Sequence, residues 1–175
     1  FFSILKSKLI LLAVIILLLR LEGDWLYQMG FRKEGITIQI ITGIIFGFAI
    51  WILINLMINP VMNSINPSSA EKGTDMMKYM KDMKSIFLWI PVIFIASFTE
   101  EFQRIFVLTR FEKWFGNFGL YLALIVSSVA FGIGHLYQGI NPAIGTAVGG
   151  LLYGLVFIRK RSAVEVITCH TFFNL

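Results

Sequence analysis

Long apolar runs, interrupted only by short polar segments, are the feature that most restricts what this chain can fold into. Residues 36–58 carry no charged side chain and are long enough to cross a bilayer, because a helix of about 20 apolar residues spans the hydrocarbon core. Only 14% of the 175 residues are charged, whereas a typical soluble domain carries about a quarter. Because lipid cannot satisfy exposed backbone groups, the sequence predicts an all-α, polytopic transmembrane helical bundle.

The spacing of the apolar runs predicts about six helices, with a polar site inside the bundle. The first run is short and follows two lysines, which also suits a signal peptide, but no small-residue cleavage site comes after it. Asn59-Pro60 should end the second helix, because the residue before a proline avoids helical geometry. The predicted helices cover residues 9–19, 36–58, 86–108, 118–137 and 143–158, and the last begins near Ser162.

The most polar stretch, residues 61–84, divides the chain into two parts. Its second half places methionines on one helical face and lysines on another. This pattern fits an amphipathic helix on the membrane surface and, equally well, a solvated linker helix. We expect residues 1–85 to form N-terminal transmembrane helices with this interfacial segment, and residues 86–175 to form the helical core that carries the polar site.

Ionisable side chains lie inside runs that otherwise have the composition of membrane helices. A charge in lipid costs on the order of a few kcal/mol, so such groups usually face a protein interior or a wet cavity. One Glu–Arg pair could be purely structural, but two adjacent carboxylates beside one guanidinium leave an excess negative charge. That excess makes one carboxylate a candidate proton carrier. The ionisable residues are Glu100, Glu101, Arg104, His135 and His170.

The spacing of these residues favours one shared site. Arg104 follows Glu100 by four residues and Glu101 by three, so both carboxylates can meet it on one side of a helix. His170 and Asn174 are four apart and share a face of a later helix. A lone histidine in a membrane can simply bind another helix, but polar groups on three helices indicate convergence on one pocket.

A carboxylate, two imidazoles and an amide suit peptide-bond hydrolysis, which needs a base for water, donors for the oxyanion and an acid for the leaving amine. No GxSxG elbow and no HExxH zinc helix occurs, and Cys169 points away from its neighbour His170 on a helix. We favour a mechanism without a cofactor. The fallback zinc ligands are Glu100, His135 and His170, because one carboxylate with two imidazoles is a known ligand set.

Two rival functions remain from other classes. A non-catalytic immunity or scaffold protein would keep the polar cluster as a packing network between helices. A proton-coupled transporter would use buried glutamate and histidine as a proton relay.

Three ordered motifs resemble those of the CPBP family of intramembrane proteases, which includes CAAX prenyl proteases, bacteriocin-processing proteins and the Abi group. Residues 131–135 (FGIGH) match its FxxxH motif, and residues 170–174 (HTFFN) match its HxxxN/D motif. The flanks RIFVLTRFEKWFG, GHLYQG and GGLLYGLVF also look familial, and the resemblance covers about residues 86–175.

The first motif departs from the family pattern EExxxR, because only two residues separate Glu101 from Arg104. An alignment on the arginine puts Thr99 and Glu100 at the two glutamate positions. An alignment on the glutamates displaces the arginine by one residue. The identity of the catalytic carboxylate therefore stays open between Glu100 and Glu101.

The resemblance implies an intramembrane endopeptidase of the glutamate type, with a metallo-type mechanism as the alternative. One glutamate and the first histidine would activate water, the second histidine and the asparagine would form the oxyanion hole, and the arginine would orient or balance the glutamates. Its substrate would be a peptide or protein at the membrane, and a prenylated CAAX tail, a bacteriocin and a membrane-bound regulator all fit. The implied site residues are Glu100, Glu101, Arg104, His135, His170 and Asn174.

The formal charge of +5 points to lipid head groups and not to nucleic acid, because the basic residues lie mainly at the ends of apolar runs. We expect a multi-pass integral protein of a prokaryotic cell membrane. The basic residues divide almost evenly between the two sides, so the orientation stays open, as does the oligomeric state.

Straight helices would separate the two halves of the expected site. Glu100 lies about 21 Å along its helix and His135 about 26 Å along the next, at a rise of 1.5 Å per residue. In antiparallel helices these residues would lie at different depths. We therefore expect a bend or break between Arg104 and Gly116, where residues 109–117 form a charged, aromatic break in the apolar pattern.

Overall fold

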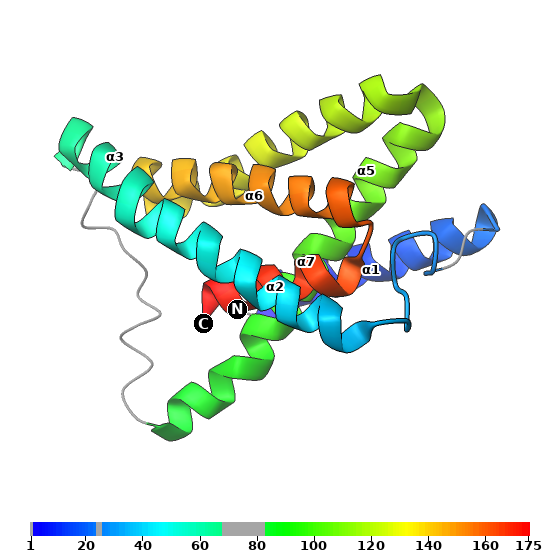
Figure 1. The fold of residues 1–175 in the computed structure, drawn as a ribbon, viewed down its shortest axis with the longest axis horizontal. Coiled ribbons are helices and arrows are strands. Elements are labelled where there is room, and N and C mark those ends of the chain that lie inside the picture. The colour runs from blue at the N-terminus through cyan, green and yellow to red at the C-terminus, as the bar shows by residue number, and fades with distance from the viewer. Residues whose placement is uncertain (1, 24–25, 68–82) are drawn as a thin grey trace.

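A computed structural model describes residues 2–23, 26–67 and 83–175, and every regular element in these ranges is a helix (Figure 1). The all-helical class expected from the composition is confirmed. The predicted amphipathic surface helix falls largely on residues 68–82, which lie outside the described residues. In chain order the elements are α1 (Phe2–Leu21), α2 (Ile36–Ile52), the π-helical turn η1 (Leu53–Ile58), α3 (Asn59–Ile65), α5 (Met83–Gly134), the 3-10 turn η3 (Leu136–Gln138), α6 (Ile140–Lys160) and α7 (Ala163–Asn174).

Three stretches of the described chain are long and apolar enough to cross a membrane: Ile36–Ile65, Trp89–Gly134 and Ile140–Lys160. The apolar part of α1, Ile10–Leu21, is shorter, and the 12 residues of α7 extend only about 18 Å. A span needs about 30 Å, so the prediction of about six spanning helices is not confirmed. Instead, α7 packs against α2, α5 and α6 within the bundle.

The second helix continues past the stop predicted at Asn59-Pro60. The α-helix changes to the wider π-helical turn at Leu53–Ile58 and then resumes as α3. Pro60 falls in the first turn of α3, where a missing N–H is tolerated. The proline therefore marks a local change in winding and does not end the helix.

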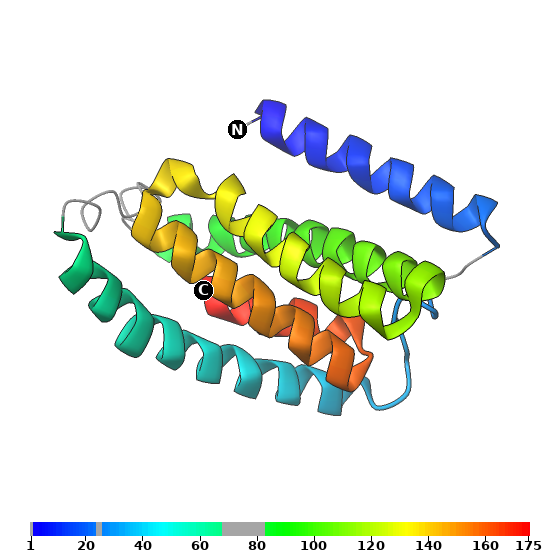
Figure 2. The same cartoon turned by 90° about the horizontal axis from the view of Figure 1, so that it is seen from above.

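The expected interruption after Arg104 is present, and it lies at Gly116. This residue has φ 62° and ψ −151°, a conformation in the region that favours glycine, and it turns α5 back on itself. Figures 1 and 2 show the two arms of α5 running in opposite directions from this turn, and Figure 1 shows them diverging as a V. Residues 109–115, which the sequence analysis assigned to a break, are helical, because charged and aromatic side chains are compatible with helix at a membrane boundary.

The first arm of α5 is longer than predicted, because the helix continues past Leu108 to the turn at Gly116. This extra length removes most of the predicted difference in position along the helices between the glutamates and His135. From Gly116 the first arm runs back about 22 Å to Glu101, and the second runs about 28 Å to His135, at 1.5 Å per residue. Measured along each arm from Gly116, the positions of the two residues therefore differ by only about 6 Å.

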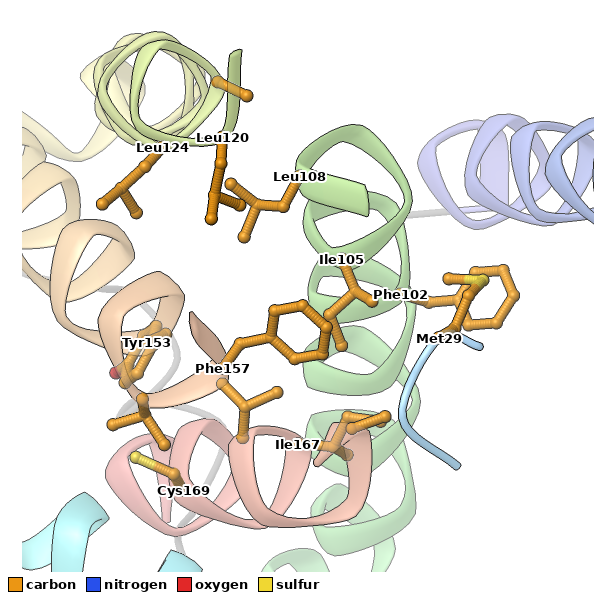
Figure 3. Close-up of a cluster of buried hydrophobic side chains, with 14 of the residues drawn as sticks. Met29, Phe102, Ile105, Leu108, Leu120, Leu124, Tyr153, Phe157, Ile167 and Cys169 are labelled. Carbon is orange, nitrogen blue, oxygen red and sulfur yellow. The ribbon is translucent and has the colours of Figure 1, made fainter. Parts of the chain in front are cut away.

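The buried core joins both arms of α5 to α6 and α7 (Figure 3). Ile105 and Leu108 of the first arm lie on the side of Phe157 of α6 and Ile167 of α7, whereas Phe102 points to the other side of this arm, toward Met29. Because these three helices share one packed interior, the polar residues on their inner faces are brought close together.

Glycines allow α2 to lie directly against α7. A Cβ at Gly43 would lie 2.6 Å from the carbonyl oxygen of Glu165, and one at Gly47 would lie 2.6 Å from that of Cys169. A glycine of α6 likewise leaves room for a neighbour, since a Cβ at Gly154 would lie 2.3 Å from the Leu124 side chain.

Ion pairs tie the polar ends of the helices together. Glu22, just after α1, pairs with Arg110 and with Lys113 Nζ at 3.2 Å, and these hydrogen bonds from Lys113 and Arg110 hold the pKa of Glu22 below its ordinary value. Arg161, between α6 and α7, donates two hydrogen bonds to Glu112 at 2.5 and 2.7 Å, which raises the pKa of Arg161. These contacts fix α1 and α7 relative to α5.

Candidate active site

A glutamate and an arginine on α5 meet a histidine of α7 in the protein interior. Glu101 Oε1 accepts hydrogen bonds from the Arg104 guanidinium and from His170 Nδ1, the latter at 2.7 Å. The Glu101 side chain is 0% exposed, and those of Arg104 and His170 are each 4% exposed. The other oxygen of Glu101 has no hydrogen-bond partner among the described residues. A buried carboxylate needs such charged donors, so these three residues form a single electrostatic unit.

The neighbouring Glu100 approaches the other nitrogen of the same imidazole. Its Oε2 lies 3.8 Å from His170 Nε2, and its side chain is 16% exposed. Thr99, the alternative residue under an alignment on the arginine, is buried and donates its hydroxyl to the carbonyl of Ala96 at 2.9 Å. The two adjacent glutamates therefore contact His170 from two sides, one fully enclosed and one partly accessible.

His135 lies immediately after α5, where the backbone leaves helical geometry. Its Nδ1 is 2.8 Å from the carbonyl oxygen of Phe131. Because a carbonyl can only accept, Nδ1 carries the hydrogen, and Nε2 is the accepting nitrogen of the neutral ring. The Phe131 ring centroid is 4.7 Å from that of His135 and 5.8 Å from that of His170, so the two imidazoles flank one aromatic ring.

Asn174, at the end of α7, is joined to the first arm of α5. Its amide nitrogen donates to the hydroxyl of Ser97 at 3.1 Å, and Ser97 itself is buried. Asn174 lies one helical turn after His170, and Ser97 lies one turn before Glu101. The amide has a second N–H, and the bond to Ser97 orients it.

Aromatic rings of two helices enclose the charged groups. The Tyr153 ring stacks on His170 with centroids 4.5 Å apart and an interplanar angle of 18°. The guanidinium carbon of Arg104 lies 4.6 Å from the centroid of Phe131 and 5.7 Å from that of Tyr153. A Cβ at Gly150 would lie 3.2 Å from a guanidinium nitrogen, so glycine leaves room for the arginine there. These contacts hold the imidazole and the guanidinium in place.

Sequence reasoning did not identify Ser97 or Tyr153 as part of this cluster. Ser97, Glu101 and Arg104 are spaced i, i+4 and i+7, which places them on one helix face, so the serine could have been found from this pattern. Tyr153 carries no comparable signal, because a tyrosine in an apolar helix is ordinary. Its position depends on how α6 packs on α7.

The fallback zinc set is not assembled. Within the ranges that the structure describes, no three His, Cys, Asp or Glu side chains are grouped so that they could hold a metal ion. Glu100 and His170 are near each other, whereas the contacts of His135 are with Phe131 and Tyr137.

These observations define a helical membrane protein with a buried cluster of carboxylate, imidazole, guanidinium and amide groups between α5, α6 and α7. The model of the family described as type II CAAX prenyl endopeptidase Rce1-like matches residues 82–175, more than half of the chain, and the chain belongs to this family. Neither a curated protein nor a solved structure matches it. The resemblance to the CPBP family seen in the sequence is thus confirmed, and family membership implies an intramembrane protease.

Proposed function

We propose that this chain is an intramembrane endopeptidase in which Glu100, together with His135, activates the water that attacks a peptide bond. The observation that carries this proposal is the contact of one α7 histidine, His170, with both carboxylates of the α5 pair. Such a juxtaposition of acid and imidazole on separate helices is typical of general acid–base sites. Membership of the endopeptidase family supports the reaction class.

The different environments of the two glutamates support Glu100 as the base. A general base must reach both water and substrate, and the Glu100 side chain is partly accessible. Glu101 is enclosed, and its Oε1 already accepts from Arg104 and His170. We assign Glu101 to holding His170 and Arg104 in position. The different burial of the two side chains supports this division of roles, and we therefore propose Glu100 as the base, a choice that the sequence left open.

His135 would hold and orient the attacking water. Its Nδ1 donates to the Phe131 carbonyl, which leaves Nε2 free of that bond and able to accept a hydrogen from water. The arrangement requires a neutral ring, so protonation of His135 would remove this acceptor.

His170 and Asn174 would bind the oxyanion. With both glutamates ionised, the glutamate pair and Arg104 carry a net charge of −1, and a second proton on His170 would neutralise the cluster and make its Nε2 a donor. The second N–H of Asn174, oriented by the bond to Ser97, would supply the other donor.

The proposed reaction then proceeds in two steps. Glu100 takes a proton as the water oxygen bonds to the carbonyl carbon, and the resulting oxyanion is held by His170 and Asn174. The C–N bond breaks as Glu100 passes that proton to the leaving amine. The substrate would be a peptide or protein that enters from the surrounding membrane, and the protein would be a multi-pass component of a prokaryotic cell membrane.

The test is cleavage by the purified protein, reconstituted in lipid, of a panel of peptides that includes a prenylated CAAX peptide. Glu100→Gln should lower the rate of cleavage by about 10²- to 10⁴-fold, the usual contribution of a general base, while the unfolding midpoint stays unchanged. Glu34→Gln is the matched control, because Glu34 is an exposed carboxylate in the loop before α2 and should leave the rate as it is.

Glu101→Gln should lower both the rate and the stability, since it breaks a buried pair. A wild-type rate in Glu100→Gln would overturn the assignment of the base. Uptake of protons coupled to a solute, without cleavage of any peptide, would favour the transporter class instead.

A further inference from the structure

An apolar groove lies on the outer surface between α2 and α6, away from the acid–imidazole cluster. Its volume is about 280 Å³, and its walls are almost entirely apolar. Figures 1 and 2 show α2 and α6 running in opposite directions, and Figure 1 shows that they cross at an angle. The residues that line it are Phe46, Ala49 and Ile50 of α2, Leu53 at the start of η1, and Leu152, Leu155, Val156, Arg159 and Lys160 of α6.

The lining residues form one stripe on each helix. From Phe46 of α2 to Leu53 of η1 they are spaced i, i+3, i+4 and i+7, and on α6 they repeat the same spacing from Leu152. Each stripe is the face that a helix would normally turn toward a partner. Leu155 is 41% exposed, so the groove is open to its surroundings. A methylene takes roughly the volume of a water molecule, about 30 Å³, so the groove has room for roughly nine methylenes of one chain.

One end of the groove is positively charged. Arg159 and Lys160 are the last two residues of α6, and both are exposed. Lys160 Nζ lies 4.0 Å from the Glu165 carboxylate and 5.7 Å from the Phe46 ring centroid, so part of its charge is already balanced. Arg159 has no ion-pair partner among the residues that the structure describes. The net charge at this end therefore favours an anion.

The bilayer itself supplies the occupant. Both α2 and α6 belong to stretches that can cross a membrane, and the 21 residues of α6 extend about 31 Å, which places its charged end near a membrane–water boundary. An acyl chain beside α2 and α6 would have its phosphate at that same boundary. Basic pockets between transmembrane helices characteristically bind anionic lipid head groups.

We propose that this groove binds one anionic phospholipid, with an acyl chain between α2 and α6 and its phosphate at Arg159 and Lys160. The site is separate from the proposed catalytic cluster, because its lining includes none of those residues. A zwitterionic lipid offers the same chain but brings a cationic group toward the two basic side chains. Phosphatidylglycerol should therefore bind more tightly than phosphatidylcholine.

Native mass spectrometry of the whole detergent-solubilised chain, titrated with phosphatidylglycerol or phosphatidylcholine, tests this proposal. Each basic residue near a membrane surface changes the affinity for anionic lipid by roughly fivefold, so Arg159→Gln with Lys160→Gln should weaken phosphatidylglycerol binding by about 25-fold. The matched control, Arg20→Gln with Lys33→Gln, removes the same charge from two exposed positions outside the groove and should retain the lipid.

A second variant addresses the apolar half of the site. Ala49→Trp fills the groove and should release the bound phosphatidylglycerol, whereas Val129→Trp, at an exposed position on the second arm of α5, should retain it. Unfolding midpoints of all variants establish that each is folded. The proposal is wrong if the Arg159/Lys160 variant binds phosphatidylglycerol as tightly as its control, or if both lipids bind equally. It is also wrong if Ala49→Trp abolishes a dimer and leaves lipid binding intact, since the groove would then join two copies.

Discussion

Replacing Arg104 with methionine should lower the free energy of unfolding by about 3–5 kcal/mol, because the change leaves a buried carboxylate without its cation. Glu101 is fully buried, and its Oε1 accepts from only two described donors, Arg104 and His170. Without the guanidinium, a single hydrogen bond at 2.7 Å remains for an ionised group that no water reaches. Methionine keeps the apolar length of the side chain, so the loss reports mainly on the charge.

The assay is thermal unfolding in detergent, followed by circular dichroism. For a domain of this size, about 3–5 kcal/mol corresponds to a lower midpoint by roughly 6–20 °C. Glu101→Gln should cost less, because the stranded guanidinium still lies over the Phe131 and Tyr153 rings at 4.6 and 5.7 Å. If the pair acts as one unit, the double variant should lose less than the sum of the two single losses, by at least about 1 kcal/mol.

Two results would refute this reasoning. Additive losses, within about 0.5 kcal/mol, would mean that the two side chains do not depend on each other. The exposed Arg20→Met should change the free energy of unfolding by under about 0.5 kcal/mol. If Arg104→Met changes it as little, the interior tolerates the lone carboxylate of Glu101.

Two further predictions concern the turn of α5 at Gly116 and the ion pairs of Glu22 with the first arm of α5. Gly116→Ala should destabilise the protein by about 1–3 kcal/mol, because φ 62° with ψ −151° is strained for any residue with a Cβ, whereas Gly134→Ala, where nothing lies within 4 Å of the new Cβ, should change unfolding by under about 1 kcal/mol. Equal effects in the two variants would argue against the turn. The lowered pKa of Glu22 implies that its pairing with Arg110 and Lys113 stabilises the fold above the ordinary value of 4.5 and that this contribution disappears as the pH falls through the lower folded value. Hydrogen exchange of α1 measured across that pH range should show the loss in the wild type and not in Glu22→Gln, and a matching loss in both would contradict it.

Much of the fold could be predicted because lipid leaves few choices. The apolar runs required helices, and the difference in depth between Glu100 and His135 required a turn after Arg104. The turn is at Gly116, the last residue of the expected window. The predicted number of about six spans is not confirmed, because apolar character does not distinguish a helix that faces lipid from a short one, such as α7, that lies against other helices.

The motifs placed Glu101, Arg104 and His170 on the inner faces of two helices, and the structure brings these three into direct contact. The sequence did not predict that residues 109–115 are helical or that the helix continues past Pro60. In both places packing against neighbouring helices outweighs residues that locally favour the end of a helix. Tyr153 was missed for a similar reason, since its stacking on His170 depends on the approach of α6 to α7.

Sequence alone determined that the chain is a helical membrane protein with acid, imidazole and amide groups at fixed spacings, because charge in lipid and the period of a helix depend only on residue order. Only the tertiary structure decided which carboxylate is enclosed by Arg104 and which stays accessible. Glu100 and Glu101 are chemically alike and adjacent, and their difference arises from the rotation of α5 against α6 and α7, which no local pattern encodes.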